Sequence, residues 1–213
     1  MPRVTLMPAI VVAALAFAPT TARAKTAPID VTHSSVTCNT VSGVMAIKPS
    51  LRASGGPTST VVKLKGTLAD CTVTPNPFFE GPFTVSGTFN ATLAGTTNHC
   101  GTFFTSGDPS LTGPLTVKWR PDQTTPILPT STKVTVINAG GFTFSSVWGT
   151  EYQQLNVDMD PLSVTGAFLP VPAITLTGMF LIPVEDVRSI NAGCSSPTGL
   201  KKLHFGFGRF SSN

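Results

Sequence analysis

Apolar and polar residues alternate along most of this chain, and a period of two is the pattern of a β-strand with one buried face. The longest strict alternation is Phe83–Leu93, where apolar and glycine positions alternate with threonine, serine and asparagine. Because helical side chains repeat about every 3.6 residues, this run cannot be one face of a helix. The same pattern predicts further strands at Leu111–Trp119, Lys133–Ile137, Phe142–Trp148, Leu162–Phe168, Ile174–Ile182 and Leu203–Phe207. The predicted fold class is all-β and antiparallel.

The connections are predicted from turn-forming residues. Asn138-Ala139-Gly140-Gly141 is expected to be the turn of a hairpin, and Thr102–Thr105 is expected to be a short strand. Glu185–Asn191 is the one predicted helical turn. The proline-rich segments Cys71–Pro82 and Arg120–Pro129 are expected to be loops, because proline cannot donate to a strand ladder.

Two strands near the start, Val41–Ile47 and Val62–Leu68, are expected to pair as a hairpin across a Pro/Gly-rich loop. One register satisfies all their apolar positions and sets these residues opposite one another: Val41 and Leu68, Gly43 and Gly66, Met45 and Leu64, Ile47 and Val62. The same register also sets Cys38 opposite Cys71. By strict alternation, these two cysteines are expected on the face of the hairpin opposite to the apolar one. Directly opposed Cα atoms lie about 4.5–5.5 Å apart, within reach of a disulfide.

Four cysteines are expected to form two disulfides in a secreted protein. The register favours Cys38–Cys71 and leaves Cys100–Cys194. In the chain-entropy model the first stabilises by about 4 kcal/mol and the second, which closes a longer loop, by about 5 kcal/mol. The rival interpretation is a metal site, but the chain has no Cys-x-x-Cys motif and no Cys/His cluster.

Each predicted apolar face carries a glycine, and these are Gly43, Gly66, Gly87, Gly113, Gly166 and Gly178. A belt of inward glycines lets a sheet coil sharply and leaves space for large rings such as Phe89 or Trp119 to lie across it. A single barrel-like domain of about 8–9 strands is therefore predicted, with a two-sheet β-sandwich as the alternative.

The N-terminus has the features of a secretory signal: Arg3, the apolar run Ala9–Ala18, and the small-x-small site Ala22-Arg23-Ala24. We therefore predict a signal peptide over residues 1–24, a single domain over residues 25–213, and a secreted or cell-envelope location. No later apolar run is long enough to cross a bilayer, so no transmembrane segment is expected in the mature chain. Removing the signal reduces the 14 basic residues to 12, against 10 acidic ones. Because the basic residues are scattered, no nucleic-acid partner is expected.

Residues that could carry chemistry are isolated. No catalytic residue, metal or cofactor is predicted, and the chain is expected not to be an enzyme. The candidates weighed are the histidines His33, His99 and His204; the oxygen ligands Asn156, Asp158 and Asp160; the carboxylates Glu80, Glu151, Glu185 and Asp186; and the sequon Asn90-Ala91-Thr92. Each also has an ordinary structural explanation, as a solvated turn, a surface charge or a chance match.

Two faces of the predicted sheet suggest binding. The inward aromatic residues Phe89, Trp119, Phe168 and Phe180 are candidate contacts for an apolar small molecule, unless they simply fill a packed core. The outward residues Lys63, Lys65, Lys118 and Arg120 could bind anionic envelope polymers or lipid headgroups, or only keep the sheet soluble. The leading hypothesis is a non-enzymatic extracellular or cell-envelope binding protein, with an apolar small molecule inside the barrel as the candidate ligand. The alternatives are a structural or adhesive surface protein, a secreted hydrolase, and an outer-membrane barrel.

The overall design resembles a loose group of uncharacterised secreted β-rich proteins of high-GC Gram-positive bacteria. The segments that carry the resemblance are the Ala-rich signal, Val36-Thr37-Cys38, Gly66-Thr67-Leu68 leading to Cys71, and Leu115-Thr116-Val117-Lys118-Trp119. The resemblance implies a secreted β-rich fold and no particular activity, and it transfers no site residue.

Overall fold

The computed structural model describes residues 27–74, 81–104, 111–122, 126–147, 150–168 and 176–212. Its elements, in chain order, are β1 (Ile29–Asp30), β2 (Ser35–Leu51), β3 (Thr60–Thr74), β4 (Phe83–Gly95), α1 (Cys100–Phe104), β5 (Gly113–Pro121), β6 (Ile127–Leu128), β7 (Ser131–Val147), β8 (Thr150–Met159), the 3-10 turn η1 (Pro161–Ser163), β9 (Thr165–Gly166), β10 (Leu176–Pro183), α2 (Val184–Ser195) and β11 (Leu200–Ser212). The predicted signal peptide lies outside the described residues.

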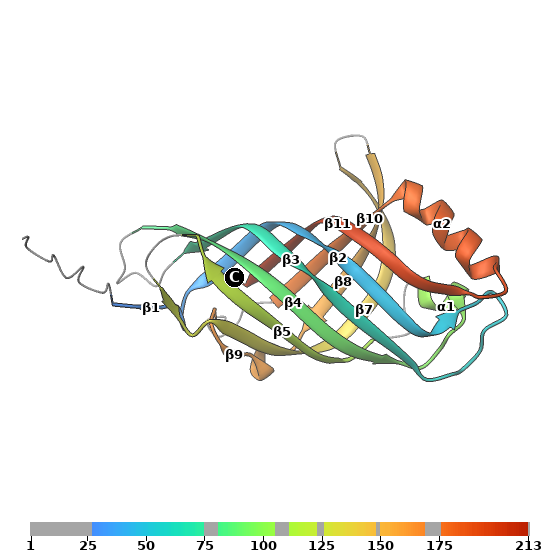
Figure 1. Cartoon of the computed structure of the whole chain (residues 1–213), viewed down its shortest axis with the longest axis horizontal. Helices are drawn as coiled ribbons and strands as arrows, with labels where there is room; N and C mark the ends of the chain where they lie inside the picture. Colours follow the sequence, from blue (N-terminus) through green and yellow to red (C-terminus); the bar gives the residue numbers. More distant parts are fainter. Residues whose placement is uncertain are drawn as a thin grey trace, which may run out of the picture.

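The main sheet curls into a barrel (Figure 1). Eight of the described strands pair antiparallel around the barrel, each with the next in the order β2, β3, β4, β5, β7, β8, β10 and β11. The last of them, β11, pairs with β2. The pairing of β5 with β7 joins what would otherwise be the two edges of the sheet. The prediction of an antiparallel, barrel-like domain is confirmed. The two-sheet alternative does not describe this topology.

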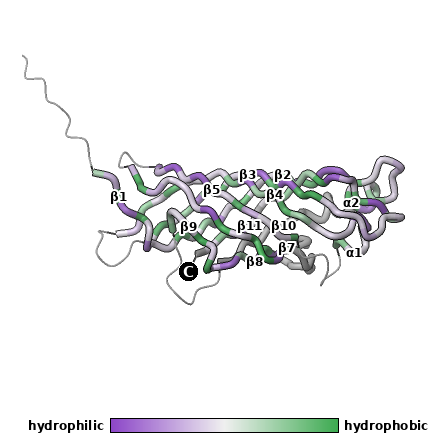
Figure 2. The backbone as a smooth tube through the Cα atoms, turned by 90° about the horizontal axis from the view of Figure 1, so that it is seen from below, coloured by the Kyte–Doolittle hydropathy of each residue, from purple (hydrophilic) through white to green (hydrophobic). Residues whose placement is uncertain are grey.

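The barrel buries its apolar face and exposes its polar one. Along β4 the inward residues Val85, Gly87, Phe89, Ala91 and Leu93 are buried, while Thr84, Thr88, Asn90 and Thr92 between them are exposed. Figure 2 shows the same mixture of hydrophobic and hydrophilic positions along the strands. The inward side chains of the described strands form one hydrophobic core. The sheet is therefore stabilised mainly from inside, where apolar area is removed from water.

The predicted hairpin of β2 and β3 is confirmed residue by residue. Val41 pairs with Leu68, Gly43 with Gly66, Met45 with Leu64, and Ile47 with Val62. Cys38 pairs with Cys71, and the two cysteines form a disulfide. The second predicted disulfide, Cys100–Cys194, is also present.

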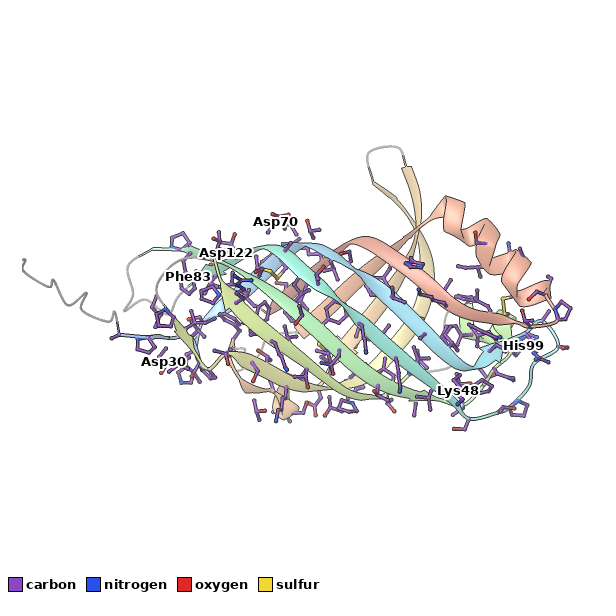
Figure 3. All side chains as sticks on the ribbon, in the orientation of Figure 1. Asp30, Lys48, Asp70, Phe83, His99 and Asp122 are labelled. Carbon is purple, nitrogen blue, oxygen red and sulfur yellow. A yellow bond between two sulfur atoms is a disulfide. The ribbon has the colours of Figure 1, made fainter. Side chains whose placement is uncertain are left out.

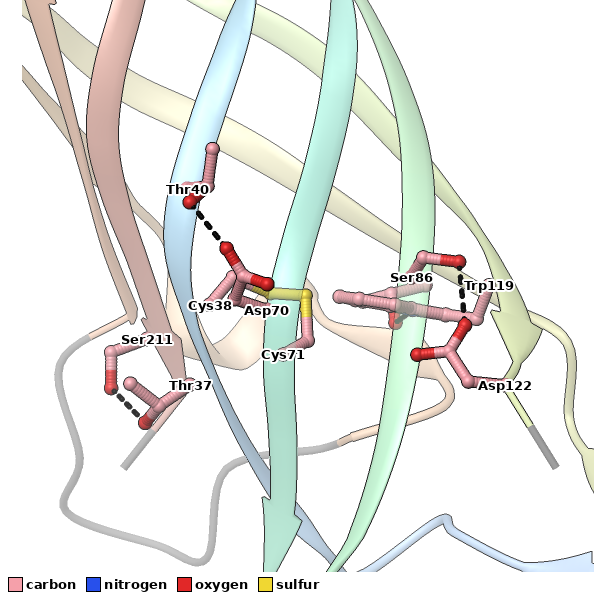
Figure 4. Close-up of a disulfide and its surroundings, with 10 residues drawn as sticks. Thr37, Cys38, Thr40, Asp70, Cys71, Ser86, Trp119, Asp122 and Ser211 are labelled. Carbon is pink, nitrogen blue, oxygen red and sulfur yellow. Dashed lines mark hydrogen bonds between the residues drawn. A yellow bond between two sulfur atoms is a disulfide. The ribbon is translucent and has the colours of Figure 1, made fainter.

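The face predicted for the first disulfide is wrong. Cys38 and Cys71 are fully buried, on the same side of the sheet as Val41 and Leu68. Cys38 lies three positions from Val41, and Cys71 lies three positions from Leu68. Strict alternation would place residues three positions apart on opposite faces. The reason is a bulge: the β3–β4 register shifts between Leu68 and Cys71, and Asp70 adopts φ of 52°. Figure 4 shows the disulfide bridging β2 and β3 beside Asp70, whose Oδ2 accepts a 2.7 Å hydrogen bond from the Thr40 hydroxyl.

The predicted turn Asn138–Gly141 is wrong. These residues lie within the single strand β7, which runs unbroken past both glycines. The β7–β8 register shifts between Val136 and Asn138 and again between Gly140 and Thr143, so the irregular residues form bulges instead of a reversal. The chain turns only after Val147, and β8 then runs back along β7.

The predicted strand Leu162–Phe168 is also wrong. Leu162 belongs to η1 and is 95 % exposed, and only Thr165–Gly166 forms a short strand, β9, paired with β7. The prediction of a solvated turn over Asn156–Asp160 is wrong as well, because Thr150–Met159 is the barrel strand β8. The side chain of Asp160 accepts from the backbone N–H of Leu162 at 2.9 Å, and this starts the 3-10 turn.

Short elements lie at the two ends of the barrel. Helices α1 and α2 lie at one end, joined by Cys100–Cys194, and β1 lies at the other, paired with β6 (Figure 1). The prediction of a short strand at Thr102–Thr105 is wrong, because α1 occupies Cys100–Phe104, whereas the predicted helix at Glu185–Asn191 is confirmed within α2. Helices α1 and α2 have 5 and 12 residues. Among the described residues, no helix is long and apolar enough to cross a membrane.

Candidate functional site

Three of the four aromatic residues that the sequence marked as ligand candidates are buried in the core. Trp119 meets the ring of Phe168 edge-on, with centroids 4.9 Å apart, and its centroid lies 6.1 Å from that of Phe210. Trp119, Phe168 and Phe89 are all buried. Phe180 belongs to β10, but its side chain is outside the described part. Phe89 and Trp119 therefore lie on the inward face of their strands, as predicted, whereas the buried Phe168 belongs to the segment after β9 and not to a strand.

The inward glycines make room for these rings. A Cβ added to Gly66 would lie 2.6 Å from Cζ of Phe89, and one added to Gly43 would lie 2.7 Å from Cζ of Phe205. The rings of Phe89 and Phe205 stack with centroids 6.2 Å apart. Because no Cβ could occupy the same space, glycine is required where these rings cross β2 and β3.

An apolar cavity of about 10 Å³ lies between these side chains, lined by residues that include Leu68, Phe89, Val117, Met159 and Phe210. This is about the volume of one water-sized probe, whereas small-molecule sites usually enclose about 300–1,000 Å³. Within the described part, this region of the barrel interior is thus filled by the protein's own side chains.

A buried hydrogen-bond chain fixes the position of Trp119. Its Nε1–H donates to Oγ1 of Thr132 at 2.8 Å, and that hydroxyl donates to the carbonyl of Ala167 at 2.5 Å. The polar atoms of a buried indole and a buried hydroxyl are both satisfied in this way. The chain connects β5, β7 and the segment after β9, so Trp119 serves the packing of the barrel.

The outer surface of β3 and β4 forms an open groove of about 530 Å³, here called the β3–β4 groove. Its lining residues are Lys63, Lys65, Gly66, Thr88, Phe89, Asn90 and Thr92. In the register Lys63 faces Thr92, Lys65 faces Asn90, and the five polar side chains are exposed. One flank of the groove is therefore cationic, and the other offers hydroxyl and amide groups.

The five adjacent strands β11, β2, β3, β4 and β5 are here called the basic wall. They carry eight basic residues, namely Lys201, Lys202, Arg209, Lys48, Lys63, Lys65, Lys118 and Arg120, against the single acidic residue Asp70. The other three barrel strands carry Lys133 against Glu151 and Asp158. The scattered lysines and arginines of the sequence are thus concentrated on one side of the barrel by its topology.

Aspartates gather near the end of the barrel that carries β1. Figure 3 labels Asp30, Asp70 and Asp122 toward that end, and Lys48 and His99 toward the other. Two hydrogen bonds from Thr32, one from its hydroxyl and one from its backbone N–H, lower the pKa of Asp30 from its ordinary value. None of these three aspartates is among the residues that line the β3–β4 groove.

The histidines predicted to have ordinary structural roles are spread over the fold. Nδ1 of His99 accepts the backbone N–H of Thr102 at 3.1 Å, so this imidazole caps α1. His33 and His204 are exposed on separate elements. No cluster of three His, Cys, Asp or Glu side chains that could hold a metal ion is found among the described residues.

Of the acidic candidates, Asp158 and Asp160 have described side chains. Asp158 is exposed on β8 and accepts from Nδ2 of Asn138 at 3.3 Å, while Asp160 caps η1. The side chains of Glu80, Glu151, Glu185 and Asp186 lie outside the described part, so a carboxylate pair among them stays a hypothesis. The sequon residue Asn90 is exposed in the β3–β4 groove, as its outward position predicted.

Nothing in the sequence alone indicates that Thr88 and Thr92 line the same groove as Lys63 and Lys65. The strand pairing of β3 with β4 supplies that link, since the two segments are separated by a proline-rich connection.

Comparison with known proteins finds no matching family model, no matching curated protein and no matching solved structure. Two disulfides fit an extracellular or otherwise oxidising environment.

Proposed function

We propose that this chain is a secreted, non-enzymatic protein that attaches to anionic material of the cell envelope through its basic wall. The observation that supports this most directly is the groove on that wall, lined by Lys63 and Lys65. A surface of one charge sign attracts polyanions and raises their local concentration. Secretion rests on the predicted signal peptide, and the two disulfides suit such a location.

The outer surface supports a binding role better than the described part of the interior around Phe89 does. The interior cavity near Phe89 measures about 10 Å³, and the ring of Phe89, which lines it, stacks on that of Phe205. An apolar ligand there would have to displace close-packed side chains, which costs the packing energy that they supply. The β3–β4 groove, by contrast, is open to solvent and needs no rearrangement to be occupied.

The proposal is tested by binding of the purified mature protein to isolated, deproteinised cell envelopes. Lys65→Gln removes one charge in the groove, and Lys133→Gln removes one at an exposed position of β7, outside the basic wall. We expect Lys65→Gln to weaken binding about five-fold, since one lysine near an anionic surface contributes about 1 kcal/mol. Lys133→Gln should change the affinity less than two-fold.

Salt gives a second measurement. Binding should be lost at about 1 M salt, where the Debye length is about 3 Å. Equal losses from Lys65→Gln and Lys133→Gln, or binding that salt does not weaken, would refute the proposal. An apolar molecule found by native mass spectrometry in protein taken from its host would instead favour a carrier with its site inside the barrel.

A further inference from the structure

We infer that the β3–β4 groove holds a linear acidic polysaccharide, an inference that rests on the proposed function and names its ligand class. The groove is bounded by two parallel rows of side chains. Lys63 and Lys65 are alternate residues of one strand, so their Cα atoms lie about 6.8 Å apart along it. Thr88, Asn90 and Thr92 form the second row on the next strand, about 4.8 Å away.

This arrangement fits a chain that lies along the strands. Anionic groups on one side of such a chain would meet the two ammonium groups, which bind as mobile point charges. Groups on its other side would meet two hydroxyls and an amide, each of which can both donate and accept hydrogen bonds. Sugar units with carboxylates offer both kinds of group in every repeat. A polymer with charge alone would leave the Thr88–Thr92 row without partners.

An acidic peptide is a poorer occupant of the β3–β4 groove, because the closed barrel leaves neither β3 nor β4 with a free edge. Extended peptides gain most of their affinity by adding a strand to a free sheet edge. Both edges of β3 are taken, by β2 and by β4, and both edges of β4 are taken, by β3 and by β5. An acidic peptide in the groove would therefore have to leave much of its backbone unpaired with the sheet.

Single-stranded nucleic acids and membranes also fit less well. Bases bind to protein surfaces largely by stacking on aromatic rings. The outward residues of β4 are threonine, serine, asparagine and alanine, and the aromatic residue lining the groove, Phe89, is only 4 % exposed. A membrane surface is too broad to enter a groove between neighbouring strands, and the large apolar residue that β3 exposes, Val61, lies outside the groove lining.

The test compares labelled oligogalacturonate with poly-L-glutamate and polyphosphate of equal charge number, all titrated at the same salt. Oligogalacturonate should bind the mature protein at least about ten-fold more tightly than the other two, because each of its repeats places hydroxyl groups beside a carboxylate and can therefore use both rows at once. The variant Thr88→Val/Thr92→Val removes both hydroxyls and nearly preserves side-chain shape. It should lower the affinity for oligogalacturonate about ten-fold and leave poly-L-glutamate binding unchanged.

The matched control is Thr72→Val/Thr84→Val. These two exposed threonines face each other on the same pair of strands, outside the groove. This variant should bind every polymer like the unmodified protein, and circular dichroism should show all variants folded. Lys63→Gln/Lys65→Gln should weaken all three polymers alike, about five- to twenty-five-fold.

The possible failures are distinguishable. If the three polymers bind equally and Thr88→Val/Thr92→Val changes nothing, the groove is a site for charge alone; the polysaccharide inference then fails while the proposed function stands. Tighter binding to a single-stranded oligonucleotide or to anionic phospholipid vesicles would also overturn the inference. If none of these polyanions binds at low salt, both the inference and the proposed function fail.

Discussion

Replacing Gly66 by alanine should destabilise the barrel, because a side chain there has no space on either side of its strand. An added Cβ would collide with the carbonyl oxygen of Ser42 on β2 and would lie 2.6 Å from Cζ of Phe89. The phenyl ring can move at some cost. The carbonyl belongs to the neighbouring strand, so relieving that contact must shift the backbone of the β2–β3 pair.

The magnitude follows from these contacts. Overpacking a well-packed core costs about 1–3 kcal/mol, and the backbone shift places Gly66→Ala at the upper end of that range. Alanine recovers about 0.4–1 kcal/mol by restricting the unfolded chain. We therefore expect a net loss of about 2 kcal/mol in the free energy of unfolding.

Two other glycines calibrate this expectation. Gly87→Ala meets only side-chain atoms, the nearest being Cε3 of Trp119 at 3.1 Å, so it should cost less than about 1 kcal/mol. Gly206→Ala in β11 meets nothing within 4 Å and should stabilise the protein by about 0.5 kcal/mol. The predicted order of stability is Gly206→Ala, unmodified protein, Gly87→Ala, Gly66→Ala.

The assay is urea unfolding of the disulfide-intact protein, followed by tryptophan fluorescence and circular dichroism. With a slope of about 1–3 kcal/mol/M, the midpoint of Gly66→Ala should fall by roughly 1 M, at an unchanged slope. The double variant Gly66→Ala/Phe89→Leu should recover little, because the Ser42 carbonyl still blocks the Cβ. Similar midpoints for Gly66→Ala and Gly206→Ala would refute the reasoning that close approach of β2 and β3 requires glycine.

Three further predictions concern other contacts. Thr132→Val should cost about 1–3 kcal/mol in urea unfolding, because the buried Trp119 Nε1–H loses its acceptor; a cost no larger than that of an exposed Thr135→Val would contradict this. Replacing Cys100 and Cys194 by alanine should cost about 5 kcal/mol, against about 4 for Cys38 and Cys71, since the bridged residues are 94 and 33 positions apart. Because hydrogen bonds from Thr32 lower the pKa of Asp30, its ionised form stabilises the fold above about pH 4 and that contribution is lost as the pH falls through the folded-state pKa. The stability difference between the unmodified protein and Asp30→Asn should therefore vanish in acid, and an NMR titration in which Thr32→Ala leaves the Asp30 pKa unchanged would contradict the cause.

The β2–β3 hairpin could be predicted from the sequence because several independent requirements select one register. Gly43 must oppose Gly66, since a side chain on either would strike the backbone of the other strand. Cys38 must oppose Cys71 for the disulfide to form. A slip of one residue would break both conditions and reverse the buried face. The face of the disulfide was missed because a bulge near Asp70 changes the phase of the alternation without leaving a sequence signal.

Strands β7 and β8 were harder to predict. Gly140-Gly141 has the composition of a turn, yet glycine serves equally well in a bulge within a long strand. The choice between them is made by pairing with β5 and β8, which is a long-range interaction. Leu162 fits the alternating pattern of a strand, but Pro161 and the Asp160 cap start a 3-10 turn there instead. Local composition cannot rank these outcomes, because their free energies differ mainly through distant contacts.

The candidate site, too, could be predicted only in part from the sequence. That Lys63 and Lys65 point outward follows from the alternation of β3 alone. That they face Thr92 and Asn90 requires the order of strands in the sheet, because β4 could have paired elsewhere. The concentration of basic residues on one wall likewise depends on β11 closing against β2. Net charge and sequence spacing therefore understate the electrostatic character of the surface.

Packing inside the barrel and the groove outside it are linked through Gly66. On the inner side its missing side chain leaves room for the Phe89 ring, and on the outer side Gly66 lines the β3–β4 groove. The glycine is thus required by the core and is, at the same time, part of the lining of the β3–β4 groove. For this reason the exposed side chains of the two flanking rows, and not Gly66 itself, are the positions at which binding can be changed without changing stability.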